Sequence, residues 1–103
     1  MEKLINSAEK LIDGEYENAI KDHGTHHSYH EAYAVLKEEI EEAETEIVRI
    51  KNLEHLLWRS VKNDDTESIK EMAIAIERNA ALLIAETAQV GAMARKCYMM
   101  EGK

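Results

Sequence analysis

The longest periodic stretch of the chain runs from Ser28 to Asn63 and reads SYHEAYAVLKEEIEEAETEIVRIKNLEHLLWRSVKN. Ser28 and Glu31 form the S-x-x-E pattern of a capping box, which marks the start of a helix. Apolar residues then recur at helical spacing, and nothing interrupts them before Asn63. The stretch predicts one helix of about 34 residues, close to 50 Å long at 1.5 Å per residue. Its predicted apolar stripe consists of Tyr33, Leu36, Ile40, Ala43, Ile47, Ile50, Leu57 and Val61.

The segment before this stretch predicts a shorter helix followed by a loop. Apolar residues at three- and four-residue spacing predict a helix over residues 3–21. Gly14 lies inside it and favours a break or kink there, because glycine weakens a helix interior by about 1 kcal/mol relative to alanine. Residues 22–27 are polar, contain a glycine and lack periodicity, so we expect a loop.

The segment after it predicts a second long helix, from about residue 66 to about residue 100. Asp64, Asp65 or Thr66 can cap its start. Proline is absent from the chain and only four glycines occur, which suits helices and leaves few turn signals. We therefore expect one all-α domain over residues 1–103, with one shorter and two long antiparallel helices.

The apolar surface of the third predicted helix indicates self-association. Apolar side chains extend beyond one face, and a helix apolar over so much of its circumference is typical of a multi-chain bundle. A short chain also has difficulty burying enough surface alone. We expect oligomerisation, as a homodimer or homotetramer, to complete the bundle. The residues that add the second apolar flank are Ala75, Leu82, Met93 and Cys97.

The charge of the chain excludes some classes of partner. Lysine and arginine number 13 against 21 acidic residues, for a net charge of −8. We therefore expect no general attraction to nucleic acid or to a membrane surface, and we expect partners that are cations, proteins or ligands that bring a metal. Cys97 is the one cysteine, and no apolar run approaches a transmembrane span, so a soluble cytoplasmic protein is expected.

Candidate chemistry begins with Glu38, Glu39 and Glu42 on the first long helix. At 100° per residue, Glu39 and Glu46 lie beside the apolar stripe, Glu42 a little further round and Glu38 further still. Carboxylates crowded at the border of a buried face repel one another unless a cation or a proton intervenes. Hard divalent ions prefer such oxygen ligands. The alternative is a solvated helix face stabilised by pairs of opposite charge four residues apart.

A helical hairpin brings a further acid to the same place. If the two long helices turn back near residue 64, Glu86 lies opposite Glu42, with Gln89 one turn away. Glu38, Glu39, Glu42 and Glu86 then converge. Because an unpaired buried charge is costly, a glutamate among apolar neighbours favours a metal site over chance placement.

These residues resemble a known family. The pattern E-E-x-x-E at residues 38–42, followed by E-x-x-Q at residues 86–89, is similar to the E-E-x-x-E and E-x-x-D motifs of the MazG-like all-α nucleoside triphosphate pyrophosphohydrolases. Residues 28–39 and 89–94 look similar to small phage or prophage members. The resemblance covers about half of the chain.

The resemblance implies that Mg²⁺ or Mn²⁺ binds a nucleoside triphosphate and activates water, releasing pyrophosphate and a monophosphate. Glu38, Glu39, Glu42 and Glu86 would be metal ligands, with Glu39 and Glu42 also acting in catalysis by orienting the water. Gln89 stands where the family has aspartate, so it can offer only an amide oxygen and removes one negative charge. The segment between the two motifs is also longer than the family usually has.

Two other functions stay open at this point. One is a non-catalytic helical oligomerisation or interaction protein whose metal site has decayed at Gln89. The other is binding of Zn²⁺ or Ni²⁺ by His23, His26, His27 and His30, whose spacing can place some of them on one face. These histidines can equally form a polar loop that titrates near pH 6.5.

Overall fold

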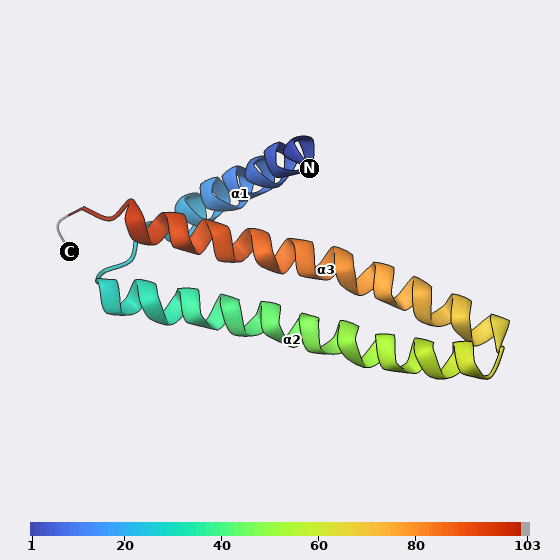
Figure 1. Ribbon diagram of the computed structural model, residues 1–103. Coiled ribbons are helices and arrows are strands. Elements are labelled where there is room, and N and C mark those ends of the chain that lie inside the picture. The colour runs from blue at the N-terminus through green and yellow to red at the C-terminus, as the bar shows by residue number, and fades with distance from the viewer. Residues whose placement is uncertain (102–103) are drawn as a thin grey trace.

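The computed structural model describes residues 1–101 and contains three α-helices (Figure 1). They are α1 (Glu2–His23), α2 (Tyr29–Lys62) and α3 (Thr66–Tyr98). Helices α2 and α3 form a long antiparallel hairpin, and α1 packs on α3 (Figure 1). The predicted all-α class with one shorter and two long helices is confirmed. None of the three helices is long and apolar enough to span a membrane.

Side-chain caps fix where the two long helices begin. The Ser28 hydroxyl accepts a hydrogen bond from the Glu31 backbone N–H at 3.2 Å, as the capping box predicts. The Glu31 carboxylate accepts from the N–H of His27 at 3.4 Å, one residue before the expected donor. Of the three candidate caps for α3, Asp65 has this role, accepting from the Ser68 N–H at 3.2 Å.

The hairpin seam follows a regular alternation of three and four residues, which is the spacing of a coiled coil. In α2 the residues that repeat every seven positions, Leu36, Ala43 and Ile50, are at least half-buried. The predicted stripe was too wide, because Ile40 and Ile47 are exposed. Contact with one partner helix covers a narrower face than contact with a broad core. The seam positions of α2 are Leu36, Glu39, Ala43, Glu46, Ile50, Leu53 and Leu57, and those of α3 include Met72, Ile76, Leu83, Glu86, Val90 and Met93.

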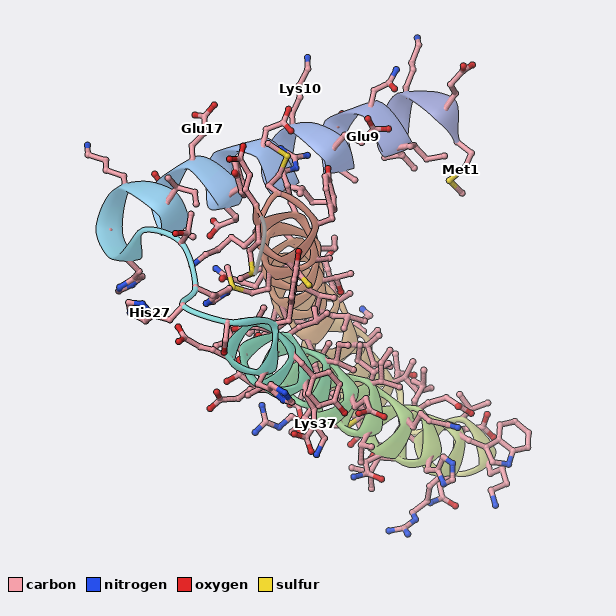
Figure 2. The ribbon with its side chains drawn as sticks, turned by 90° about the vertical axis from the view of Figure 1, so that its left-hand side faces the viewer. Met1, Glu9, Lys10, Glu17, His27 and Lys37 are labelled. Carbon is pink, nitrogen blue, oxygen red and sulfur yellow. The ribbon has the colours of Figure 1, made fainter. Side chains whose placement is uncertain are left out.

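Helix α1 crosses the end of the hairpin and contacts α3 but not α2 (Figure 2). Its attachment is tight at Gly91, where an added Cβ would lie only 2.6 Å from Cδ1 of Ile12. An ion pair of 2.8 Å between Arg95 and Asp13 fixes the same region. Gly14 does not break the helix. Helix α1 is continuous through Gly14, and contacts with α3 on both sides of this glycine hold the backbone helical.

Little of the apolar surface is enclosed within residues 1–101. The buried apolar residues are alanines or methionines, and no large side chain is fully buried. The radius of gyration is 17.6 Å, against about 13 Å for a compact domain of this length. The chain is therefore extended, with dimensions of 60 × 29 × 22 Å.

Candidate metal centre

Three carboxylates converge on one side of the hairpin. Glu39 and Glu42 project from α2 and Glu86 projects from α3, and one oxygen of each lies within 4.8 Å of the others. Glu39 and Glu86 are half-buried at seam positions, whereas Glu42 is exposed beside the seam. Within residues 1–101, no other trio of acidic, histidine or cysteine side chains comes this close.

The surroundings of these groups disfavour their charged forms. Loss of hydration is the main cause that raises the pKa of Glu39, followed by repulsion from Glu42 and then from Glu86. Burial is also the main cause of the raised pKa of Glu86, and the charge of Glu42 raises this pKa further. Binding of a cation relieves both effects, because it replaces lost hydration and screens the repulsion.

Two other predicted ligands lie at the edge of the trio. Glu38 is exposed and outside it, although its charge contributes to the raised pKa of Glu39. Gln89 lines the same cavity of about 280 Å³ as the three carboxylates. Its Nε2 donates a hydrogen bond to Oε2 of Glu15 at 2.7 Å, which leaves the amide oxygen as its possible metal ligand.

Glu46 is a nearby acid that the sequence places beside the apolar stripe but that was not predicted to be a metal ligand. It is only 5% exposed. One of its oxygens pairs with Arg49, while its Oε2 is buried and has no partner within residues 1–101. Its charge also contributes to the raised pKa of Glu86. Its seven-residue spacing from Glu39 places both acids in one seam, in agreement with the predicted position beside the stripe.

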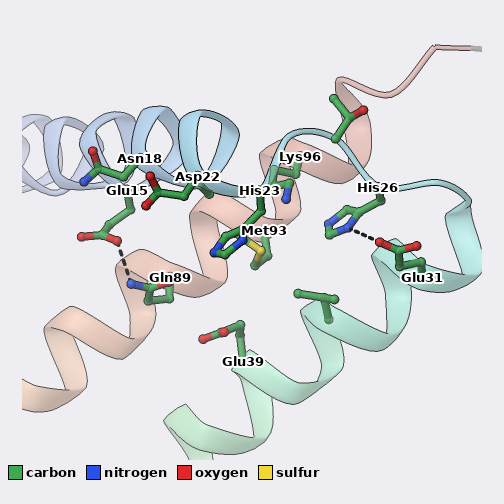
Figure 3. A pocket seen from close by; sticks show the side chains of 13 residues that line it. Glu15, Asn18, Asp22, His23, His26, Glu31, Glu39, Gln89, Met93 and Lys96 are labelled. Carbon is green, nitrogen blue, oxygen red and sulfur yellow. Dashed lines mark hydrogen bonds and ion pairs between the residues drawn. The ribbon is translucent and has the colours of Figure 1, made fainter.

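A larger cavity of about 450 Å³ adjoins the carboxylates (Figure 3). Glu39 and Gln89 line both cavities, so the two spaces meet along these side chains. The larger cavity is bounded by all three helices and the loop after α1. His26 and Lys96 contribute to its wall, and both are buried.

The histidines that the sequence groups together do not converge on one metal site among the described residues, although His23 and His26 both line the larger cavity. His26 is buried and lies 3.3 Å from Glu31, whereas His27 and His30 are exposed. In the described part of the chain, no histidine belongs to a three-ligand group. The geometry therefore gives no support to a Zn²⁺ or Ni²⁺ site made of these histidines.

Comparisons with protein-family models, curated proteins and solved structures give no significant match. The fold and the site together define a small all-α, three-helix protein with an exposed acidic cluster.

Proposed function

We propose that this protein is a Mg²⁺-dependent nucleoside triphosphate pyrophosphohydrolase of the MazG-like type. The observation that carries the proposal is the trio of Glu39, Glu42 and Glu86, of which Glu39 also lines the adjoining cavity of about 450 Å³, a volume that suits a small ligand. The products are a nucleoside monophosphate and pyrophosphate.

The donor set fits Mg²⁺ or Mn²⁺. All the candidate ligands are oxygens, from Glu39, Glu42, Glu86 and the amide of Gln89, and hard divalent ions prefer oxygen. Opposite ligands of Mg²⁺ lie about 4.2 Å apart, so oxygens within 4.8 Å need only a small side-chain movement to reach coordination distance. The unpartnered carboxylate oxygen of Glu46 adds negative charge beside them.

The charge of the protein makes a metal necessary for this substrate. With a net charge of −8, the chain repels a triphosphate unless cations intervene. The metal supplies neutralisation of phosphate charge and a lower pKa for the attacking water. In this proposal Glu39 and Glu42 orient that water, while Glu86 and Gln89 complete the binding site and Glu38 acts through the surrounding water.

We further propose that the functional unit is a homodimer or a homotetramer. The described chain exposes 7,750 Å², whereas a compact monomer of 11.8 kDa exposes about 5,900 Å². The excess of about 1,800 Å² exceeds the roughly 800 Å² per partner that a standard interface buries. A second copy is the natural cover for the apolar groove between α1 and α3, which is lined by Leu11, Ile12, Leu83 and Ile84 among others.

A non-catalytic interaction protein is the second candidate. The extended apolar surface favours it, because an interaction scaffold needs an apolar surface to bind its partner. The neutral Gln89 also favours it, because a scaffold does not need a complete set of metal ligands. In that case substitutions in the carboxylate trio leave the biological interaction unchanged.

The deciding experiment is pyrophosphate release from a panel of ribo- and deoxyribonucleoside triphosphates with Mg²⁺ or Mn²⁺. Metal-dependent release that is abolished by Glu39→Gln is the expected result. The matched control is Glu41→Gln, which removes an exposed carboxylate two residues away on the same helix. Absence of release from every nucleotide would favour the interaction protein.

A further inference from the structure

The side chain of Lys96 is mostly buried, and its ammonium has no partner in the described chain. The residue is 5% exposed, and no hydrogen bond or ion pair joins its ammonium to any residue of the range 1–101. Its side chain lines the larger cavity, and Nζ itself keeps accessible surface. A lysine ammonium can only donate hydrogen bonds. This part of the cavity therefore suits a ligand that presents an acceptor oxygen.

His26 contributes a second unpartnered polar atom to the same cavity wall. It is 7% exposed, and its Nδ1 lies 3.3 Å from the carboxylate of Glu31. The hydrogen bond with His26 is the main cause that lowers the pKa of Glu31, so the carboxylate is ionised and can only accept. Nδ1 is therefore assigned as the donor to this carboxylate, which leaves Nε2 as the free nitrogen of the ring. Nε2 is buried and has no partner among the described residues.

The two side chains lie at a distance from the carboxylate trio that a nucleotide can bridge. On α3, Lys96 comes ten residues after Glu86, which is about 15 Å along the helix, and seven residues after Gln89, which is about 10 Å. Figure 3 shows Lys96 and His26 on the side of the cavity away from the Gln89 and Glu15 pair. A nucleotide whose phosphates lie at the trio therefore directs its base toward Lys96 and His26.

We infer that Lys96 and His26 read the base and select nucleotides that carry a carbonyl oxygen next to a ring N–H. Lys96 donates to the carbonyl oxygen, and Nε2 of His26 accepts from the ring N–H. Uracil, thymine and guanine present this pair of groups. Adenine and cytosine present an amino group beside an unprotonated ring nitrogen, which reverses both contacts. The inference rests on the proposed pyrophosphohydrolase function and names its substrate class.

Direct binding of nucleoside monophosphates tests the inference without requiring catalysis. Isothermal titration with UMP, GMP, AMP and CMP in the presence of Mg²⁺ is expected to show UMP and GMP binding roughly 10- to 100-fold more tightly than AMP and CMP. Lys96→Met should reduce this preference to about threefold or less, since the methionine keeps the volume and removes the donor. Lys70→Met, at an exposed position of the same helix, should leave the preference unchanged.

The outcomes separate this inference from the proposed function. Equal binding of the four monophosphates by the wild type overturns base reading, even if pyrophosphate release occurs. A uniform loss of affinity in Lys96→Met also overturns it, because that result assigns Lys96 to a phosphate. Base preference without pyrophosphate release supports base reading and overturns the hydrolase. Absence of binding by all four overturns the inference.

Discussion

Gln89 of α3 donates a hydrogen bond from its Nε2 to Oε2 of Glu15 in α1, over 2.7 Å and 74 positions of sequence. The contact has two consequences. It ties the shorter helix to the hairpin next to the carboxylate trio, and it fixes which end of the amide faces Glu15. The neutral residue at this position therefore stabilises the attachment of α1, which an aspartate would repel through the charge of Glu15.

Gln89→Asp is expected to tighten Mg²⁺ binding and to destabilise the metal-free protein. The added carboxylate strengthens the donor set, while its repulsion from Glu15 and the lost hydrogen bond cost about 1 kcal/mol of the free energy of unfolding. Calorimetric titration with Mg²⁺ and urea denaturation measure the two effects. Adding Glu15→Gln should restore most of the stability, and failure to do so would contradict the role assigned to this pair.

Mg²⁺ is expected to raise the Tm of the wild type and to leave that of Glu86→Gln nearly unchanged. A ligand that binds only the native state stabilises it by about 1.4 kcal/mol at ten times its Kd. Without metal, Glu86→Gln should be slightly more stable than the wild type, by less than about 1 kcal/mol, since solvent screens part of the relieved repulsion. Differential scanning fluorimetry with Mg²⁺ and with EDTA provides the measurement. Equal Mg²⁺ shifts in both proteins would place the metal elsewhere.

The carboxylate trio predicts a specific dependence of stability on pH. The pKa values of Glu39 and Glu86 are raised above their ordinary value of 4.5, so above that pH the native state holds more protons than the unfolded state. The contribution of these two carboxyl groups to the free energy of unfolding is therefore fully present below pH 4.5 and falls as the pH rises through their native pKa values.

Urea denaturation between pH 4.5 and pH 7 in EDTA measures this dependence. The double variant Glu39→Gln/Glu86→Gln should gain stability relative to the wild type as the pH rises, whereas Glu77→Gln, at an exposed acid of α3, should not. If the free energy of unfolding changed with pH in the same way in the wild type and the double variant, repulsion between these carboxylates would be contradicted.

Substitution of two glycines by alanine tests which of them lies at a contact between helices. Gly14→Ala should stabilise the protein by about 1 kcal/mol, because nothing lies within 4 Å of the added Cβ and alanine favours the helix. Gly91→Ala adds the same methyl group against Ile12 and should lose that gain. Hydrogen exchange should show faster opening of α1 in Gly91→Ala only. Equal stabilisation by both variants would show that α1 does not pack tightly against Gly91.

Ile84→Glu should dissociate the oligomer. Ile84 is 58% exposed at the groove between α1 and α3, and a charge there opposes burial against a second copy. Sedimentation equilibrium should give a multiple of 11.8 kDa for the wild type and a lower mass for the variant. Asn52→Glu adds the same charge at an exposed position of α2 and should leave the mass unchanged. A monomeric wild type would refute the proposed assembly.

The sequence by itself determined the three helices and the register of the hairpin. Local signals suffice for helix ends, since Ser28 and Asp65 cap the residues that directly follow them. Two antiparallel helices of similar length that are joined by a short turn can pair in one register only. That register predicted that Glu86 lies opposite Glu42, and the two carboxylates do lie together in the trio.

Only the tertiary structure decided how α1 attaches and which polar groups it buries. The Gln89 contact with Glu15 and the continuous helix through Gly14 depend on side chains of another helix, which local propensity does not encode. The burial of His26 and Lys96 likewise requires α1, the following loop and α3 to meet. Such contacts join residues far apart in the chain, so their energies appear only when the helices pack together.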